Sequence, residues 1–236
     1  ITKLIAYSDN VRTMFNEPVR ANDQSKIDCL RLEDLNHAKH RFQSTQRPLG
    51  RFVLTFDALL ATAVEISVTR KNERRNLAMD FLEGVTEEDF LTIAMLADAG
   101  DESAVVVRFF DQENYDVAAV PEVISKYLHR IDLLFTKRHC LSLVGTYTEF
   151  AIQELRRPRA IALHVRNKMR GFGGNRLNPR VIDRCLSRMT AWVRLVLESI
   201  SAEFPSWEIL NAFGAFSLKL ADQSSFVRES LQRISH

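Results

Sequence analysis

Residues 51–69 read RFVLTFDALLATAVEISVT. Apolar side chains cover most of a helix drawn through this stretch, which predicts a largely buried core helix. Asp57 and Glu65 interrupt the stretch, and no apolar run in the chain reaches the roughly 20 residues that a membrane-spanning helix needs. We therefore expect a core helix here and no membrane partner.

The rest of the chain also favours helices over strands. Glycine (8) and proline (6) are scarce, and few segments alternate strictly between polar and apolar residues. We expect a predominantly all-α, multi-helix fold. The expected helices cover 3–15, 27–44, 51–69, 77–82, 87–100, 102–112, 121–135, 147–155, 160–169, 179–203 and a last helix after Ser206, with a break at 46–50. Gly84 is expected to end one helix, and Thr86 with Asp89 to cap the next.

Length and cysteine content bound the organisation of the chain. Its 236 residues suit one large domain or two small ones. We expect a helical domain over 1–155, then a basic segment with aromatic helices over 156–236, and the two could form one domain. The odd number and wide spacing of the cysteines, Cys29, Cys140 and Cys185, predict free thiols in a reducing compartment, the cytosol or the nucleus. We expect an intracellular protein, nuclear if the source is a eukaryote. Because the chain begins without methionine, we expect it to be a piece of a longer polypeptide.

The strongest functional signal is a basic segment over residues 156–188, RRPRAIALHVRNKMRGFGGNRLNPRVIDRCLSR. Its ten cations face one acid, Asp183, although the whole chain carries a net charge of only +2. These cations are Arg156, Arg157, Arg159, Arg166, Lys168, Arg170, Arg176, Arg180, Arg184 and Arg188. Such an excess predicts a polyanionic partner, with duplex DNA favoured. The alternatives are a solvated basic face, or arginines that pair with acids elsewhere in the fold.

Spacing within this segment refines the prediction. Pro179 follows Asn178 as the first residue of a helix, and this helix carries Arg180, Arg184 and Arg188 on one face. Guanidinium groups bind phosphate oxygens in bidentate fashion. The glycines at 171–174 lack the lysine and hydroxyl residue of a phosphate-binding loop, so a hinge or tight turn is expected there.

Three other groups of residues could carry function. His37 and His40, one turn after Asp34, could hold a metal, but no second pair of ligands accompanies them, so we expect no metal and no cofactor. Six acids could form a two-metal nuclease site, although helix caps and surface positions are their default role. These acids are Asp98, Asp101, Glu102, Asp111, Glu113 and Asp116. An aromatic C-terminal surface could bind a partner or a second copy of the chain; its residues are Trp207, Leu210, Phe213 and Phe216.

The order of several motifs resembles the helical insertion region of hAT-type DNA transposases and of host proteins derived from them. The motifs are RPLGRF at 47–52, AMDFL at 78–82, FLTIAMLAD at 90–98, the helix at 117–135, WV at 192–193 and EFPSW at 203–207. The resemblance implies a helical insertion in an RNase H-like catalytic domain, which helps to hold transposon ends and to form dimers. The Cys-x-x-His element of that family is missing after Cys29 and Cys140, so the resemblance assigns no catalytic residue here.

Three functions remain open from the sequence. The favoured one is a DNA-binding helical region of a transposase-like protein, without catalytic activity of its own. The alternatives are a protein-interaction or dimerisation module without nucleic-acid contact, and a stand-alone metal-dependent nuclease built on the acids at 98–116.

Overall fold

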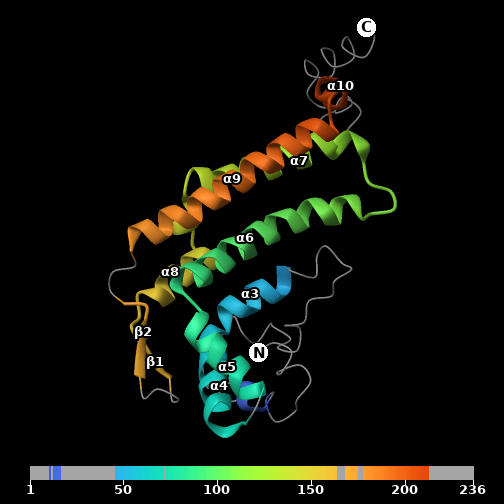
Figure 1. The fold of residues 1–236 in the computed structure, drawn as a ribbon. Helices are drawn as coiled ribbons and strands as arrows, with labels where there is room; N and C mark the ends of the chain where they lie inside the picture. Colours follow the sequence, from blue (N-terminus) through green and yellow to red (C-terminus); the bar gives the residue numbers. More distant parts are fainter. Residues whose placement is uncertain are drawn as a thin grey trace. The chain divides into compact units, whose positions relative to one another are not determined.

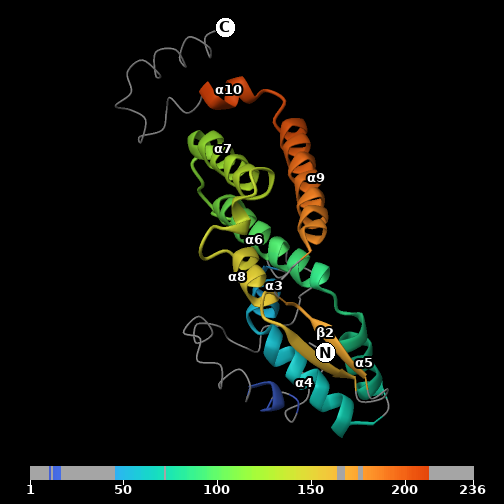
Figure 2. The same cartoon turned by 90° about the vertical axis from the view of Figure 1, so that its left-hand side faces the viewer.

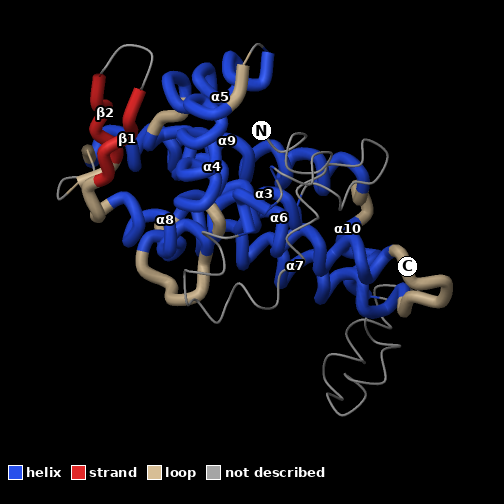
Figure 3. Tube along the Cα trace, turned by 90° about the horizontal axis from the view of Figure 1, so that it is seen from below, coloured by secondary structure: helices blue, strands red, loops and turns tan. Residues whose placement is uncertain are grey.

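A computed structural model describes residues 11, 13–16, 46–71, 73–163, 168–174 and 178–212. It divides the chain into two compact units that alternate along the sequence: unit 1 contains Ile1–Gly100 and Cys140–Cys185, and unit 2 contains Asp101–His139 and Leu186–His236. The predicted predominance of helix is confirmed, since only one pair of strands accompanies the helices in the described part of the chain (Figures 1 and 3).

Unit 1 contains a series of helices and one hairpin. Its complete helices are α3 (Gln46–Leu54), α4 (Phe56–Thr69), α5 (Glu73–Gly84) and α8 (Tyr147–Leu155), and the 3-10 turn η4 (His139–Leu141) begins at the last residue of the preceding unit 2 segment. The strands β1 (Arg159–Leu163) and β2 (Lys168–Phe172) form the hairpin. Helices α6 (Glu87–Phe110) and α9 (Pro179–Glu203) begin in this unit and continue into unit 2.

Unit 2 is all helical where it is described. The later parts of α6 and α9 belong to it, together with the 3-10 turn η2 (Val117–Ala119), α7 (Val120–Ile131), the π-helical turn η3 (Asp132–Thr136) and α10 (Trp207–Ala212). Phe135 and Trp192 meet edge to face with ring centroids 6.0 Å apart. Ser103 and Tyr127 join α6 to α7 through a hydroxyl pair 3.0 Å apart, and Glu102 accepts a hydrogen bond from Arg130.

Most predicted helices in the described ranges are confirmed. Helix α5 ends at Gly84, α8 covers the predicted 147–155, and α9 covers 179–203. Thr86 and Asp89 form the predicted cap, because the Asp89 amide donates to the Thr86 hydroxyl while the Asp89 carboxylate accepts from the Thr86 amide. Residues 11 and 13–15 of the first predicted helix are helical, and residue 16, predicted to begin a loop, is helical too; the predicted helix 27–44 lies outside the described residues.

The predicted break at 46–50 is wrong, because these residues form the start of α3. Proline is tolerated in the first helical turn, where its missing N–H has no helical acceptor. Gly50 lies in the helix where the ring of Tyr147 approaches closely: a Cβ at position 50 would lie 2.6 Å from the Tyr147 hydroxyl oxygen. The glycine therefore serves side-chain packing rather than a turn.

The single core helix predicted over 51–69 is two helices, α3 and α4, whose axes differ by 78°. The bend lies at Thr55, whose hydroxyl donates to the Arg51 carbonyl over 2.7 Å. Such a side-chain bond competes with regular helix bonding and bends helices. Most of α4 is buried as predicted, including Leu59, Ala63 and Ile66.

Two further boundaries also differ. Helix α6 passes through Gly100 without a break, so the predicted helices 87–100 and 102–112 are one helix of 24 residues. The predicted helix 160–169 is instead the β1–β2 hairpin (Figure 2). Ile161 and Phe172 are buried while Ala160 and Met169 are exposed, and this two-residue alternation defines a half-buried strand pair.

Three aromatic rings in mutual contact fix the hairpin in the core of unit 1. Phe56 of α4 stacks on Phe90 of α6 with centroids 4.1 Å apart, and Phe172 of β2 lies 5.2 Å from Phe56. Gly173 follows at once with a φ of 73°, and a Cβ there would lie 2.7 Å from the carbonyl oxygens of Leu155 and Arg157. Gly171 and Phe172 belong to β2 rather than to the predicted hinge or tight turn, and the close approach at Gly173 explains why a glycine is needed there.

We expect Gly173→Ala to lower the free energy of unfolding by about 2–3 kcal/mol, because the new methyl group would meet backbone oxygen at a strained φ. Gly84→Ala is the control, since a Cβ at Gly84 has no atom within 4 Å. Urea titration followed by circular dichroism measures both variants. Equal stability of the two would show that the close approach at Gly173 is absent.

Candidate nucleic-acid interface

Arg159, the first residue of β1, is bound inside unit 1 rather than presented to solvent. Its guanidinium donates to both carboxylate oxygens of Asp57 on α4, over 2.6 and 3.1 Å, and to the carboxylate of Glu154 on α8. Burial lowers the pKa of Arg159, but the hydrogen bonds and charges of Asp57 and Glu154 outweigh burial, so its pKa lies above the ordinary value. With only 15% of its side chain exposed, Arg159 joins three elements and is not available to a phosphate.

Arg170 of β2 is also bound inside unit 1. Its guanidinium donates to three main-chain carbonyls at the end of α5, those of Leu82, Glu83 and Val85, over 3.1, 2.7 and 2.6 Å. The last carbonyls of a helix receive no hydrogen bond from a backbone N–H of the same helix, and they carry its negative partial charge. A cation beside them therefore stabilises the helix end. Arg170 therefore acts as a cap for α5.

Strand geometry explains why these two arginines point inward. The register pairs Arg159 with Phe172 and Ile161 with Arg170. Residues directly opposite one another in an antiparallel pair share a face, and alternate residues along each strand share a face. Arg159 and Arg170 consequently lie on the same face of the hairpin as the buried Ile161 and Phe172.

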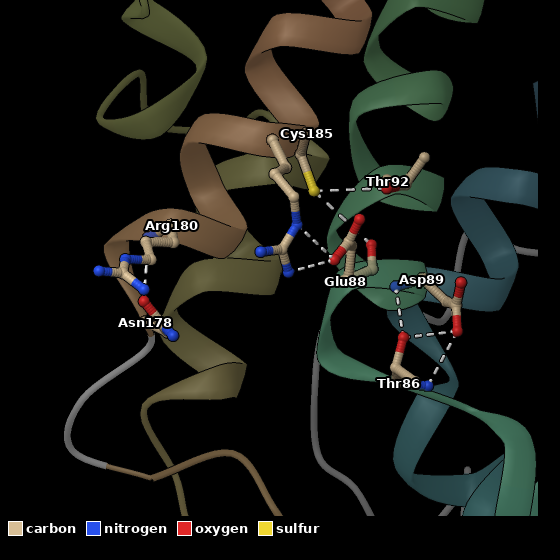
Figure 4. A network of polar contacts seen from close by, with 8 residues as sticks. Thr86, Glu88, Asp89, Thr92, Asn178, Arg180 and Cys185 are labelled. Carbon is tan, nitrogen blue, oxygen red and sulfur yellow. Dashed lines mark hydrogen bonds and ion pairs between the residues drawn. The ribbon is translucent and has the colours of Figure 1, made fainter.

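Arg184 lies in the first turns of α9, where Figure 4 shows the neighbouring Cys185 beside Glu88 and Thr92 of the start of α6. Its Nε and Nη2 donate to the Glu88 carboxylate over 3.0 and 2.5 Å, and this interaction raises the pKa of Arg184. The next residue, Cys185, donates from Sγ to the Glu88 carbonyl and lies 3.4 Å from the hydroxyl of Thr92. About half of the Arg184 side chain remains exposed, so it can face a solvent-side ligand from a fixed position.

Helix α9 begins as predicted, with an unusual charge at its start. The Asn178 side chain accepts a hydrogen bond from the Arg180 amide over 3.0 Å, and the first turn contains no acid (Figure 4). The positive partial charge of this helix end is therefore reinforced by Arg180 rather than compensated. Arg180, Arg184 and Arg188 are all exposed and lie at spacings of four on one face of α9.

The remaining predicted cations fall into two groups. Arg156 and Arg157 are exposed at the end of α8, and Arg157 pairs with Glu154 over 2.9 Å. Arg166 and Arg176 lie outside the described residues, as does the side chain of Lys168. The structure thus assigns two of the predicted contacts, Arg159 and Arg170, to internal bonds and leaves those of α8 and α9 at the surface.

Two of the six acids considered for metal chemistry, Asp98 and Asp116, serve local structure. Buried Asp98 of α6 accepts hydrogen bonds from the amides of Tyr147 and Thr148 and from the Thr148 hydroxyl, which fixes the start of α8. Asp116 accepts from the Ala118 amide and caps η2. Within the described ranges, no group of three or more histidine, cysteine, aspartate or glutamate side chains could hold a metal ion. Asp34, His37 and His40 lie outside those ranges.

Cys140 and Cys185 are buried and in no disulfide, and Cys29 lies outside the described residues. Burial, with a smaller contribution from the charge of Asp98, raises the pKa of Cys140 to about 12. The thiol therefore stays protonated at physiological pH and is a core side chain rather than a nucleophile.

The C-terminal partner surface is described only in part. Trp207 and Leu210 are half-buried, and Phe204 packs edge to face on Trp207 with centroids 6.2 Å apart. Phe213 and Phe216 lie outside the described residues. Apolar side chains that remain exposed nearby in unit 2 are Leu195, Leu197 and Ile209.

Sequence reasoning missed the internal acceptors Asp57, Glu88 and Glu154. The available signal was the pair of short alternations Arg159-Ala160-Ile161 and Arg170-Gly171-Phe172, in which each arginine shares a strand face with an apolar residue. Because a stretch this short fits a helix as well as a strand, the alternation did not stand out.

Comparisons with known proteins give no further assignment: no family model, curated protein or solved structure shows a significant match to this chain. Among the described helices, none alone is long and apolar enough to cross a membrane; α3 and α4 reach that length only together, across their bend.

The assignment of Arg159 to the interior and of Arg180 to the surface can be tested by measuring the free energy of unfolding of variants. Arg159→Ala leaves the carboxylates of Asp57 and Glu154 without this partner, so we expect the free energy of unfolding to fall by about 2 kcal/mol. Arg180→Ala removes an exposed side chain and should change it by less than about 0.5 kcal/mol. Urea unfolding at pH 7 compares the two, and similar losses would contradict the assignment of Arg159 to the interior.

The pKa of Cys140 gives a dependence of stability on pH. The unfolded thiol ionises from its ordinary pKa of 9.0, whereas the folded thiol stays protonated until about pH 12. Its contribution to stability is therefore complete below pH 9 and is lost as the pH rises toward 12, by about 1 kcal/mol at pH 10. Urea unfolding at pH 8 and pH 10 should show a smaller alkaline loss in Cys140→Ala than in the parent. An identical loss would mean that the thiol ionises in the folded protein.

Proposed function

We propose that this chain binds duplex DNA through its phosphate backbone, using the arginine face of α9, defined as Arg180, Arg184 and Arg188. The observation that carries the proposal is the exposure of these side chains at spacings of four along one helix whose first turn has no acid. A phosphate near this helix end would meet both the guanidinium groups and the positive end of the helix dipole.

The internal hydrogen bonds of Arg159 and Arg170 narrow the proposed contact to fewer arginines but do not contradict it. Apart from Arg159 and Arg170, the cations of the basic segment whose side chains the structure describes are exposed: Arg156 and Arg157 after α8, and the arginine face of α9. Contacts of this kind position a protein on DNA without reading its sequence, since phosphates are the same at every base. We expect binding that is strongly dependent on salt and weakly dependent on sequence.

The resemblance to hAT-type transposases gives the proposal a context. Under that resemblance the chain is a helical region that holds DNA ends within a larger enzyme, and cleavage belongs to acids of an RNase H-like core. We assign no catalytic residue to this chain and propose no independent activity for it.

The test is a fluorescence anisotropy titration of a labelled DNA duplex at several salt concentrations. Arg180→Ala/Arg188→Ala should weaken binding and reduce the slope of log affinity against log salt by about two, one for each lost phosphate contact. Lys126→Ala/Lys137→Ala removes two exposed cations from unit 2 and should leave the slope of the parent.

Two results would contradict the proposal: an affinity independent of salt, or equal effects of the two double variants. A parallel titration with an RNA duplex of the same length distinguishes the two nucleic acids. Comparable affinity for both would show that the arginine face binds phosphate without preference for DNA.

A second candidate is a dimerisation module. It is favoured by the exposure of Leu195 on α9 (60%) and Ile209 on α10 (54%), two aliphatic side chains of unit 2. Sedimentation velocity over a range of concentrations would show a dimer that Leu195→Gln/Ile209→Gln disrupts. A monomer at all concentrations that still binds DNA would reject this candidate.

A further inference from the structure

Three aromatic rings form a cluster at the C-terminal end of α6. Phe109, Phe110 and Tyr115 lie with centroids 5.3, 5.7 and 5.4 Å apart in the three pairs, each tilted or edge to face. The cluster is partly open to solvent, because Phe109 and Phe110 are half-buried, Tyr115 is 39% exposed and the following Val117 is 51% exposed. This is an aromatic surface within unit 2 that the proposed DNA contact does not use.

Three exposed acids, Asp111, Glu113 and Asp116, lie between and beside these rings in the sequence. Asp116 is engaged in capping η2. Among the described residues, the carboxylates of Asp111 and Glu113 have no hydrogen bond and no ion pair, and neither pairs with the exposed neighbour Arg108. The surface therefore carries negative charge that the described fold does not neutralise.

The position of these acids adds to that charge. Asp111 follows directly after the last residue of α6 and Glu113 comes two residues later, and this end of the helix of 24 residues already carries a negative partial charge. An acid at this end is unfavourable for the helix, so capping does not explain Asp111 or Glu113. A bound cation would relieve the repulsion.

A metal ion does not fit this surface, since the described carboxylates form no group that could hold one. Nucleic acid does not fit it either, because its phosphates would be repelled. A guanidinium fits both halves of the surface: its plane stacks on aromatic rings, and its N–H groups bind carboxylates.

We propose that the aromatic–acidic patch, defined as Phe109, Phe110, Asp111, Glu113 and Tyr115, docks an arginine-containing segment of a partner protein. Charge complementarity selects a basic segment, and the exposed rings select arginine over lysine because the guanidinium is planar and weakly hydrated. Tyrosine and arginine are also enriched at the centres of protein interfaces.

The experiment measures anisotropy of fluorescein-labelled tetra-arginine and tetra-lysine peptides with the full chain at low salt. Tetra-arginine should bind about threefold more tightly than tetra-lysine, as expected for cation–π contacts at an exposed site. Asp111→Asn/Glu113→Gln should weaken both peptides about fivefold, the effect of losing two exposed ion pairs. Tyr115→Leu keeps the apolar volume and should abolish the preference for arginine while leaving tetra-lysine affinity unchanged.

The matched control is Glu198→Gln/Glu203→Gln, which removes the same charge from exposed positions of α9. Equal weakening by this control would overturn the proposal, since binding would then follow net charge alone. A preference for arginine that survives Tyr115→Leu would also overturn it. Loss of a parent dimer on Asp111→Asn/Glu113→Gln, seen by sedimentation, would instead identify a second copy as the occupant and reject a separate partner. None of these variants touches the arginine face of α9, so failure here leaves the DNA proposal open.

Discussion

The ion-pair network of Arg159 is the interaction on which unit 1 most depends. One guanidinium joins β1 to α4 through Asp57 and to α8 through Glu154. Helix α8 and β1 are neighbours in the sequence, whereas α4 is distant from both. A partly buried charge is tolerable only when it has such partners. The network therefore joins the hairpin to α4 and to the end of α8. In the same core, the Phe172 ring packs against the rings of Phe56 and Phe90.

The same geometry decides which cations can meet a ligand. A local excess of positive charge counts for recognition only where the side chains reach solvent, and the pleat of the hairpin turns Arg159 and Arg170 toward the interior. In helix α9, by contrast, the arginines recur every four residues, which places Arg180, Arg184 and Arg188 on one exposed face. The basic segment thus contains both the arginines that bind inside unit 1, Arg159 and Arg170, and those proposed to contact phosphates.

The acids divide in a comparable way. Asp98 and Glu88 are held against neighbouring elements of unit 1, where each fixes a helix start or an arginine. Asp111 and Glu113 in unit 2 have no such role, and they lie beside partly exposed rings at the unfavourable end of α6. Charges that a fold uses internally and charges that it leaves at a surface therefore look alike in the sequence, and only their surroundings separate them.

What the sequence determined by itself is the local structure with strong signals. The helical class, the cap of Thr86 with Asp89, the end of α5 at Gly84 and the start of α9 at Pro179 all follow from contacts within a few residues. Gly50 and Arg170 show what the tertiary structure decided. Position 50 in α3 suits glycine because the Tyr147 ring occupies the space of a side chain, and Arg170 is internal because carbonyls at the end of α5 accept its hydrogen bonds. Both depend on residues nearly one hundred positions away in the sequence. Neither the hydrophobic periodicity nor the secondary-structure propensity of a segment contains information about such distant contacts.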